Sequence, residues 1–589
     1  MPRAGMIQQE IPQFLGVNLR EERMDLADEE LAKCINADLH LSPGTIVLRL
    51  GRTAQNSAAL SDLIVRRITK ANSTNYRIAG AKIYRGDTLL TDPSSVDLSS
   101  NLITTFDTHR PDNDSTTWLF IADDAVMRKD DATDLRRWGI TGPAAAATLS
   151  ATGTGLTGDY NARYTYVRKS GSNIAHESNP SAAAGSAQTL SNENLGVAVI
   201  ASSDGQVDKI RIYRTIAGGS TYLFDQEVDN TTATVTSSQA DTALTTLMEE
   251  DNDEPALASW CLENGGFMFT CREASNPHYL RWSKRFRPES FPSTNFIKVG
   301  APEDPLQCIL PATTVVGPKQ TVAMMGAFTR LTKYVVTQNI VSEFKAEEAL
   351  SHRGTPAPQA AITTERGILF VARDGIFAST LLAPDFPFAE KILPLFFGET
   401  VNEMDPINWS AATKMSAALF KNRYYLSYAS GSNVFPDKIA VFSNDTKKWY
   451  HYDHPISSLY YEEGNDQLLA GGQNGFVYIL ENGSTDDGTD ISLDVQTKDY
   501  WGTESRFTKK LFPYFKVDFA GDGDSITANF FVDGVSKRSV SISGDRTGKL
   551  LRLPENTMGQ RWRIKFSYTG SKRPRIYGCS AMYVPLQAA

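Results

Sequence analysis

Carboxylates and histidines are the side chains of this 589-residue sequence that could hold a metal ion. Two runs rich in aspartate, Asp486–Asp490 and Asp522–Asp524, carry the oxygen ligands that Ca²⁺ prefers. Neither run has the downstream glutamate that an EF-hand requires, and polar β-turns explain both. The seven histidines are scattered, and the closely spaced His451 and His454 lack an accompanying zinc-binding helix. We therefore predict no metal-ligating residues.

Catalysis would need an activated nucleophile, facing carboxylates or a phosphate-binding loop. The sequence has no Gly-x-Ser-x-Gly, Walker or dinucleotide-binding motif. Ser443–Trp449 resembles the Asp-box of sialidases, but it lacks the glycine and is one residue short, so we interpret it as a turn before an aromatic strand. The two facing carboxylates of a glycoside hydrolase leave no pattern in a one-dimensional sequence. We predict no catalytic residues, no cofactor-binding residues, no cofactor and no enzymatic activity.

The cysteines and the charge indicate the environment of the chain. The number of cysteines is odd, and the only close pair lacks a metal-ligand spacing, so we expect free thiols formed in a reducing cytoplasm. These cysteines are Cys34, Cys261, Cys271, Cys308 and Cys579. A formal net charge of −9 argues against a bulk surface that binds DNA phosphates. We interpret the basic cluster Arg506–Lys510 as a solvated sheet edge protected by lysine.

Length and composition favour several β domains. The chain is long enough for about two to four domains, and its 22 Tyr and 28 Phe, with many Thr, Ser, Val and Gly, favour strands. The N-terminal residues have no apolar run behind them, so we expect no signal peptide. No stretch of about 20 apolar residues predicts a membrane span.

The opening segment, Gly16–Gly51, predicts a helix, a turn and a strand. Asp28 is a good helix N-cap, and acidic residues follow it in the first turn. The apolar spacing i, i+3, i+4 predicts a short amphipathic helix that buries Leu31, Cys34 and Ile35 as packing residues. A turn and an alternating strand follow at Pro43–Gly44 and Ile46–Leu50.

A recurring unit of strand, small turn and strand predicts a β-propeller. From Phe267 onward the leading strands lie roughly 43–57 residues apart, near the roughly 40–50 residues of a four-stranded blade. An ordinary meander or sandwich with similar hairpins is the alternative. The units are Tyr76–Tyr84, Trp118–Arg128, Phe267–Trp282, Val322–Val336, Gly367–Phe377, Tyr424–Phe442 and Gln467–Tyr478.

Between Trp138 and Trp260 the repeat is interrupted by short alternating strands, the pattern of an immunoglobulin or fibronectin type III β-sandwich. Tyr164–Val167, the turn Glu177–Ser181 and the strand Ile210–Thr215 resemble the fibronectin-like insert common in phage and prophage virion proteins. We expect the acidic run that closes the insert, Glu249–Glu254, to be a solvated linker.

From about Asp490 onward, alternating strands carry Lys and Arg on their solvent faces, and Asp533–Gly534 is a hairpin signal between two of them. We predict an all-β fold: a β-propeller interrupted by an immunoglobulin/fibronectin III-like insert and followed by a C-terminal β-sandwich. The predicted domains are 1–140 (opening helix and first blades), 141–254 (insert), 255–489 (remaining blades) and 490–589 (C-terminal sandwich).

The opening segment also carries a family resemblance. Its ordered motifs resemble the start of the tail nozzle (tail tubular protein B-like) proteins of short-tailed bacteriophages, and packaged-DNA-stabilisation proteins begin similarly. The motifs are Gly16-Val17-Asn18, Asn36-Ala37-Asp38-Leu39, Ser42-Pro43-Gly44 and Arg49-Leu50-Gly51. They cover about the first tenth of the chain, and the chain departs in length from the best-known members.

The resemblance implies a structural virion protein of the phage tail, assembled in the host cytoplasm. It implies a homohexameric ring below the portal-adaptor complex, which forms the DNA exit channel and carries tail fibres or tailspikes. The acidic total predicts a lumen along which genomic DNA slides without sequence-specific binding. The interface residues stay unassigned. Two alternatives remain: a virion-associated glycan-binding or glycan-hydrolysing propeller, and a hub or baseplate component of a long-tailed phage.

Overall fold

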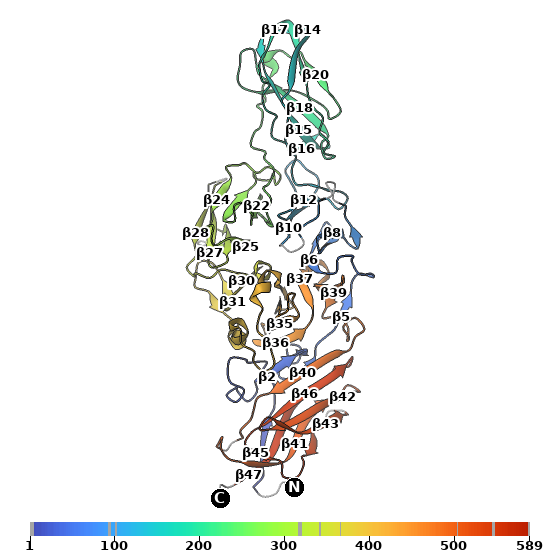
Figure 1. Cartoon of the computed structure of the whole chain (residues 1–589), viewed down its shortest axis with the longest axis vertical. Helices are drawn as coiled ribbons and strands as arrows, with labels where there is room; N and C mark the ends of the chain where they lie inside the picture. Colours follow the sequence, from blue (N-terminus) through green and yellow to red (C-terminus); the bar gives the residue numbers. More distant parts are fainter. Residues whose placement is uncertain are drawn as a thin grey trace. The chain divides into compact units, whose positions relative to one another are not determined.

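The computed structural model describes residues 5–91, 96–99, 103–315, 321–340, 343–365, 367–502, 505–544 and 548–586. They form 47 strands and five short 3-10 helices (Figure 1). The helices are η1 (Asp241–Ala243), η2 (Pro358–Ala360), η3 (Glu390–Phe397), η4 (Trp409–Lys414) and η5 (Glu463–Asn465). No helix in this described part is long and apolar enough to cross a membrane. The predicted all-β class is confirmed.

Five sheets of the described residues have four strands each, and neighbouring strands are consecutive in sequence, the arrangement of propeller blades. Each of the seven predicted strand–turn–strand units pairs as expected. The first sheets are β6 (Val65–Ala71), β7 (Thr74–Ala79), β8 (Lys82–Arg85) and β9 (Thr88–Leu89); β10 (Thr105–His109), β11 (Trp118–Ala122), β12 (Met127–Asp130) and β13 (Leu135–Arg137); and β21 (Trp260–Asn264), β22 (Phe267–Cys271), β23 (Tyr279–Trp282) and β24 (Phe296–Lys298).

The later blade sheets are similar, but the one formed by residues 416–453 continues into a nine-stranded sheet and the last takes a strand from the opening segment. They are β25 (Leu306–Val315), β26 (Thr321–Thr329), β27 (Lys333–Ile340) and β28 (Glu343–Glu348); β29 (Ile362–Thr364), β30 (Gly367–Ala372), β31 (Gly375–Ser379) and β32 (Phe386–Pro387); β33 (Ser416–Phe420), β34 (Arg423–Tyr428), β35 (Lys438–Ser443) and β36 (Lys448–Asp453); and β37 (Ile456–Glu462), β38 (Gln467–Gly472), β39 (Val477–Leu480) and β5 (Arg52–Ala54). The chain divides into two compact units, residues 1–70, 76–80 and 355–589 (unit 1) and residues 71–75 and 81–354 (unit 2).

One blade of unit 1 takes its outer strand from the opening segment. Strand β5 pairs antiparallel with β39, with Thr53 opposite Ile479. A side chain at Gly51 would place its Cβ 1.9 Å from the carbonyl oxygen of Thr485, so only glycine fits here. The buried Arg49 binds both carboxylate oxygens of Asp486, at 2.8 and 2.6 Å. The N-terminal segment therefore belongs to the blades as well as to the C-terminal part of the chain.

The predicted helix in the opening segment is wrong, because residues 31–35 form a strand, β2 (Leu31–Ile35). This strand lies antiparallel to β40 (Ile491–Thr497) and touches β36 in parallel, with Ile35 opposite His451. All five of its residues are buried, as a strand between two others requires and one face of a surface helix does not. The acidic residues before it cap a turn, where the Glu30 carboxylate accepts the Ala27 amide at 3.2 Å.

Asn36 joins three segments directly after β2. It has left-handed backbone angles (φ 57°) and is buried. Its side-chain oxygen accepts the Arg49 guanidinium and the Asp453 amide, both at 2.9 Å. Its side-chain nitrogen donates to the Ser492 carbonyl at 2.7 Å. One asparagine thus links a blade strand, a C-terminal strand and the segment before β5.

The C-terminal strands form two sheets that share strands with the opening segment. One continues from β36 through β2 and β40 to β46 (Trp562–Gly570), β42 (Ser525–Val532) and β43 (Val535–Ser543). The other contains β3 (Ala37–Asp38), β4 (Ile46–Leu48), β47 (Arg575–Pro585), β41 (Lys510–Ala520) and β44 (Lys549–Arg552), with β1 (Ile7–Ile11) on β47 and β45 (Met558–Gly559) on β41. Stacked aromatic rings fill the core, with Phe530 and Trp562 5.8 Å apart.

The insert is a β-sandwich of a three-stranded and a four-stranded sheet. The strands are β14 (Thr148–Tyr160), β17 (Gln188–Ala198) and β20 (Thr234–Ser237), and β16 (Asn173–Glu177), β15 (Ala162–Ser170), β18 (Lys209–Arg214) and β19 (Leu223–Asp229). The predicted Glu177–Ser181 turn closes one edge, because the Ser178 hydroxyl accepts the Tyr166 amide at 3.0 Å and the Ser181 hydroxyl accepts the Tyr164 amide at 3.2 Å.

The run Glu249–Glu254 is in part the solvated linker that the sequence predicts, because Glu249, Glu250 and Asp251 are exposed and lie outside any strand. Its carboxylates also bind cations of the insert and of the neighbouring blades. Glu249 pairs with Arg287 at 2.5 Å, Glu250 with Arg163 at 2.7 Å and Glu254 with Arg137 at 3.0 Å, while Asn252 is buried. The run therefore ties the end of the insert to the blades of unit 2.

We expect Asn36→Ala to destabilise unit 1 by about 2–4 kcal/mol, because it removes three hydrogen bonds from a buried site and leaves their partners unpaired. Asn556 has the same left-handed conformation (φ 60°) but is exposed, and its side chain makes no hydrogen bond within the described part of the chain. Asn556→Ala is therefore the matched control for backbone strain alone. Calorimetric unfolding measures both, and equal losses of stability would contradict the linking role of Asn36.

We expect acid to lower the stability of unit 1, because a buried imidazole of the folded chain resists protonation. Burial lowers the pKa of His451 to about 3, and neither ring nitrogen has a hydrogen-bond partner among the described residues. The unfolded imidazole titrates near about 6.5, so only the unfolded chain gains a proton as the pH falls from about 6.5 to 3, and stability falls with it. His451→Phe should reduce the loss between pH 7 and pH 5 by about 2 kcal/mol. The exposed His352, replaced in the same way, is the control; an unchanged pH dependence in His451→Phe would refute the assignment.

Candidate functional site

The aspartate runs bind the protein's own donors. In the first run, Asp486 holds Arg49. In the second, Asp524 accepts the Tyr568 hydroxyl at 2.9 Å and Asp522 accepts the Arg573 amide at 3.3 Å. Among the residues that the structure describes, no group of three or more His, Cys, Asp or Glu side chains could hold a metal ion. The turn interpretation accounts for both runs.

The other sequence candidates are structural as well. In Ser443–Trp449, the Ser443 hydroxyl accepts the Thr446 amide at 3.2 Å, which makes the turn before β36. In the basic cluster, Arg506 pairs with Asp25 at 2.5 Å. Lys510 is not on a solvated edge but buried, where it donates to the Thr508 and Gln560 carbonyls at 3.0 and 3.2 Å. All five cysteines are free and buried, as predicted.

One carboxyl group has the raised pKa that a general acid needs. Burial raises the pKa of Asp107 to about 6, although its carboxylate accepts the backbone amides of Glu263 and Thr108, at 2.5 and 2.7 Å. Asp107 does not line the cleft that the loop Arg110–Ser115 helps to form. Its hydrogen bonds connect strand β10 to strand β21 of the next blade, which is a structural use.

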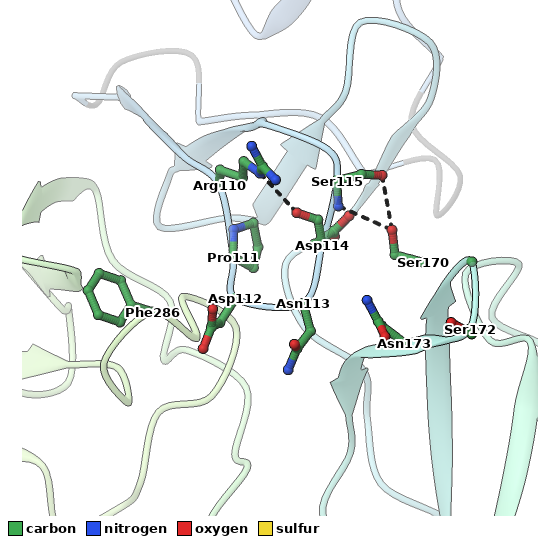
Figure 2. A pocket seen from close by; sticks show the side chains of 11 residues that line it. Arg110, Pro111, Asp112, Asn113, Asp114, Ser115, Ser170, Ser172, Asn173 and Phe286 are labelled. Carbon is green, nitrogen blue, oxygen red and sulfur yellow. Dashed lines mark hydrogen bonds between the residues drawn. The ribbon is translucent and has the colours of Figure 1, made fainter.

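The candidate site is a cleft of about 600 Å³ in unit 2, where the insert meets the blades (Figure 2). Three loops form it: Arg110–Ser115 after β10, the turn Ser170–Asn173 between β15 and β16, and the loop after β23 that carries Phe286. A second hollow of about 390 Å³ adjoins it and shares Asp112, Asn113, Ser172 and Asn173. The lining is polar except for Pro111 and Phe286.

A buried ion network holds the walls of this cleft together. Arg168 of the insert binds Asp114 of the first loop at 2.6 Å and Glu289 of the third at 2.5 Å. Lys129 of β12 also pairs with Glu289. The ring of Trp118 lies 4.6 Å from the Lys129 nitrogen and 4.9 Å from the Arg168 guanidinium carbon. Two cations and two carboxylates balance inside the protein.

Attraction between the charges of the network outweighs the effect of burial on its carboxylates. Burial by itself raises the pKa of Glu289, but Arg168 and Lys129 outweigh it and hold that pKa well below its usual range. Asp114 follows the same pattern, with its pKa lowered by Arg168. Beside them, burial lowers the pKa of His176 to about 3, so this imidazole is neutral at pH 7. Since the carboxyl pKa values are depressed, the stability they contribute is present above about pH 4.5 and is lost as the pH falls further.

The backbone of Phe286 is held in a strained conformation. It has left-handed backbone angles (φ 56°), which bulky residues adopt only under constraint, yet its side chain is 42% exposed. Its amide donates to the Gly266 carbonyl at 2.6 Å, and its own carbonyl accepts the Asp112 amide at 2.8 Å. A Cβ at Gly266 would lie 2.5 Å from the ring. The ring also stacks on His109, with centroids 6.4 Å apart, and the Arg285 guanidinium lies 4.9 Å from the ring centroid.

Four polar side chains of the cleft have no internal partner. Asp112, Asn113, Ser172 and Asn173 are exposed, and their side chains make no hydrogen bond or ion pair within the described part of the chain. Figure 2 shows Asp112 and Asn113 between Phe286 on one side and Asn173 on the other. The adjoining Ser115 and Ser170 hydroxyls, by contrast, bind each other at 3.1 Å. The cleft therefore offers unpaired donors and acceptors beside an aromatic ring.

Sequence reasoning missed this cleft because its residues read as ordinary turn formers. The segments Pro111-Asp112-Asn113 and Gly171-Ser172-Asn173 are typical of loops between strands. They lie sixty residues apart, in two different predicted domains. The residues that join these loops, Arg168 and Asp114, stand among other polar residues in the sequence and give no local signal.

Comparisons with known proteins identify no family. No family model matches the chain, and no curated protein matches it. Among solved structures, an exo-β-1,3-galactanase from Phanerochaete chrysosporium has a TM-score of 0.23 at 10% identity, covering 56% of this chain and 97% of that one. PorZ, a bacterial surface component of the type IX secretion system of Porphyromonas gingivalis, has a TM-score of 0.23 at 9% identity, covering 90% and 88%. A BBS1N chain, solved in complex with ARL6DN, has a TM-score of 0.25 at 13% identity, covering 65% and 93%. TM-scores this low assign neither a shared fold nor a function, so the fold rests on the strand pairings themselves.

We expect Arg168→Met to destabilise unit 2 by about 3–5 kcal/mol, because it leaves two buried carboxylates without their shared cation. Arg287→Met is the matched control, since the Arg287–Glu249 pair is about half exposed and should contribute less than about 1 kcal/mol. Calorimetry or proteolysis at the base of the insert measures the difference. Equal losses in the two variants would contradict the role of the network.

Proposed function

We propose that this chain is a non-enzymatic structural protein of a bacteriophage tail, a nozzle subunit of the kind that its opening resembles. The observation that carries the proposal is the position of the opening motif. Asn36, at the start of the Asn36-Ala37-Asp38-Leu39 motif, links the blade strand β36, the C-terminal strand β40 and Arg49. The residues behind the resemblance therefore serve assembly of the fold rather than ligand binding.

The use of buried charge supports a structural role. Arg423 is buried between Asp38 and Glu481, at 3.4 and 3.3 Å. Arg49 and Arg168 neutralise buried or half-buried carboxylates in the same manner. A hydrolase keeps such carboxylates free to exchange protons with a substrate. In this chain, these carboxylates connect segments that are distant in sequence.

The proposal includes the assembly that the resemblance implies. The subunits form a homohexameric ring docked on the adaptor protein, and the ring carries tail fibres or tailspikes. Genomic DNA passes through the lumen without sequence-specific contacts, in keeping with the net charge of −9. A hub or baseplate role in a long-tailed phage differs from this in neighbours rather than in chemistry.

Mass photometry of the purified chain, alone and mixed with the adaptor protein of the same phage, tests the proposal. We expect particles of about six subunits, either directly or on the adaptor, and the chain in purified virions by mass spectrometry. Interfaces of this kind bury roughly 1,200 Å² or more, so the ring should persist at micromolar concentration. A strictly monomeric chain that is absent from virions would overturn the proposal.

A second candidate function, glycan binding, is favoured by the cleft in unit 2. An exposed ring beside unpaired carboxylate, amide and hydroxyl groups suits a polyhydroxylated ligand. The cleft volume of about 600 Å³ also lies in the range of roughly 300–1,000 Å³ that small-molecule sites occupy. Glycan binding is compatible with a structural role, since a tail protein meets the host surface.

A further inference from the structure

We propose that the cleft between the insert and the blades binds a neutral saccharide. One pyranose ring packs against Phe286, and its hydroxyls are bound by Asp112, Asn113 and Asn173. This inference rests on the glycan-binding candidate function and gives it a site and a ligand class. The adjoining hollow and two further clefts, at Pro12 and at Pro255, lack an exposed, strained aromatic ring beside unpaired polar side chains.

The aromatic contact is the first step. The C–H groups of a pyranose form an apolar face that packs against an aromatic ring, whose surface carries negative partial charge. Phe286 stays 42% exposed although its left-handed backbone is strained. The exposed Arg285 guanidinium lies over the ring, 4.9 Å from its centroid, so a sugar would displace this side chain. Backbone strain persists where the surrounding structure enforces it, and such strain concentrates at functional sites. Here Gly266 leaves room for the ring, and two backbone hydrogen bonds keep the strained residue in place.

The hydrogen-bonding groups are the second step. A sugar hydroxyl both donates and accepts, so it is best bound by a mixture of acceptors and donors. The Asp112 carboxylate accepts only, whereas the Asn113 and Asn173 amides do both. None of the three is occupied by another described side chain or backbone group. Because Arg168 fixes the loop of Asp112 and Asn113 to the insert that carries Asn173, these groups are held ready before a ligand arrives.

The charge of the cleft selects a neutral ligand. The buried network of Arg168, Lys129, Asp114 and Glu289 balances internally and offers no net charge. The other charged residues of the lining are one cation, Arg110, and one carboxylate, Asp112, so the lining is close to neutral as well. An anionic sugar would meet the unpaired Asp112 carboxylate. Binding should therefore change little between low and high salt, unlike binding of nucleic acid.

The test is saturation-transfer NMR of the full chain with lactose, maltotriose and N,N′-diacetylchitobiose, with 3′-sialyllactose as the anionic comparison. We expect binding of at least one neutral probe without its hydrolysis. Phe286→Ala and Asn173→Ala should each weaken that binding at least about tenfold. Phe507→Ala is the matched control, because Phe507 is 84% exposed and lies in unit 1. Asn173→Ala removes no internal contact, so it keeps the test valid if Phe286→Ala lowers stability.

The possible results distinguish an error in the location of the site from an error in the glycan-binding function. Wild-type affinity in both cleft variants would overturn the site, while the glycan-binding function would stand with its site elsewhere. No binding of any of the four probes would overturn both. Binding of 3′-sialyllactose alone, weakened by Phe286→Ala, would overturn the neutral ligand class. None of these results bears on the nozzle assembly, which is measured by particle mass.

Discussion

Unit 1 depends on the pairing of five buried residues, β2, with strands from two different parts of the chain. Strand β2 lies between β36 of a blade and β40 of the C-terminal sandwich, and Asn36 continues the link with three side-chain hydrogen bonds. Unpaired backbone groups at this depth would each cost about 1–3 kcal/mol, so the blade and the sandwich are completed only when the opening segment is in place. Strand β5 then supplies the outer strand of another blade.

Unit 2 uses buried charge for the same purpose. Removing two cations and two carboxylates from water is costly, and good pairing geometry offsets that cost. Arg168 binds Asp114 and Glu289 from two different loops through its two terminal nitrogens, while its Nε has no hydrogen-bond partner among the described residues. An ion network of this kind specifies one arrangement of the insert against the blades, because any other arrangement would leave a buried charge unpaired.

The acidic run Glu249–Glu254 adds a second set of ion pairs at the base of the insert.

The cleft lies where the insert contacts the blades, and four of its polar side chains, unpaired among the described residues, are free to bind a ligand. Elsewhere, candidate reactive groups such as Asp486 and Ser443 accept hydrogen bonds from the protein's own donors. Around Phe286 the polar side chains are unpaired, and the backbone is held in a strained conformation. The site takes its residues from the insert and from the blades, and the ion network beside it keeps their loops together.

The amino-acid sequence by itself determined the all-β class, the blade hairpins, the sandwich pattern of the insert and the buried free cysteines. These follow from alternating apolar residues and local turn chemistry, which act over a few neighbours. The tertiary structure alone decided that Leu31–Ile35 is a strand, that Asp486 binds Arg49 and that Lys510 is buried, since each outcome depends on partners distant in sequence, from 50 residues for Lys510 and Gln560 to 437 for Arg49 and Asp486. It also decided the cleft: Asp112, Asn173 and Phe286 are unremarkable in sequence and become a site only because Arg168 brings their loops together.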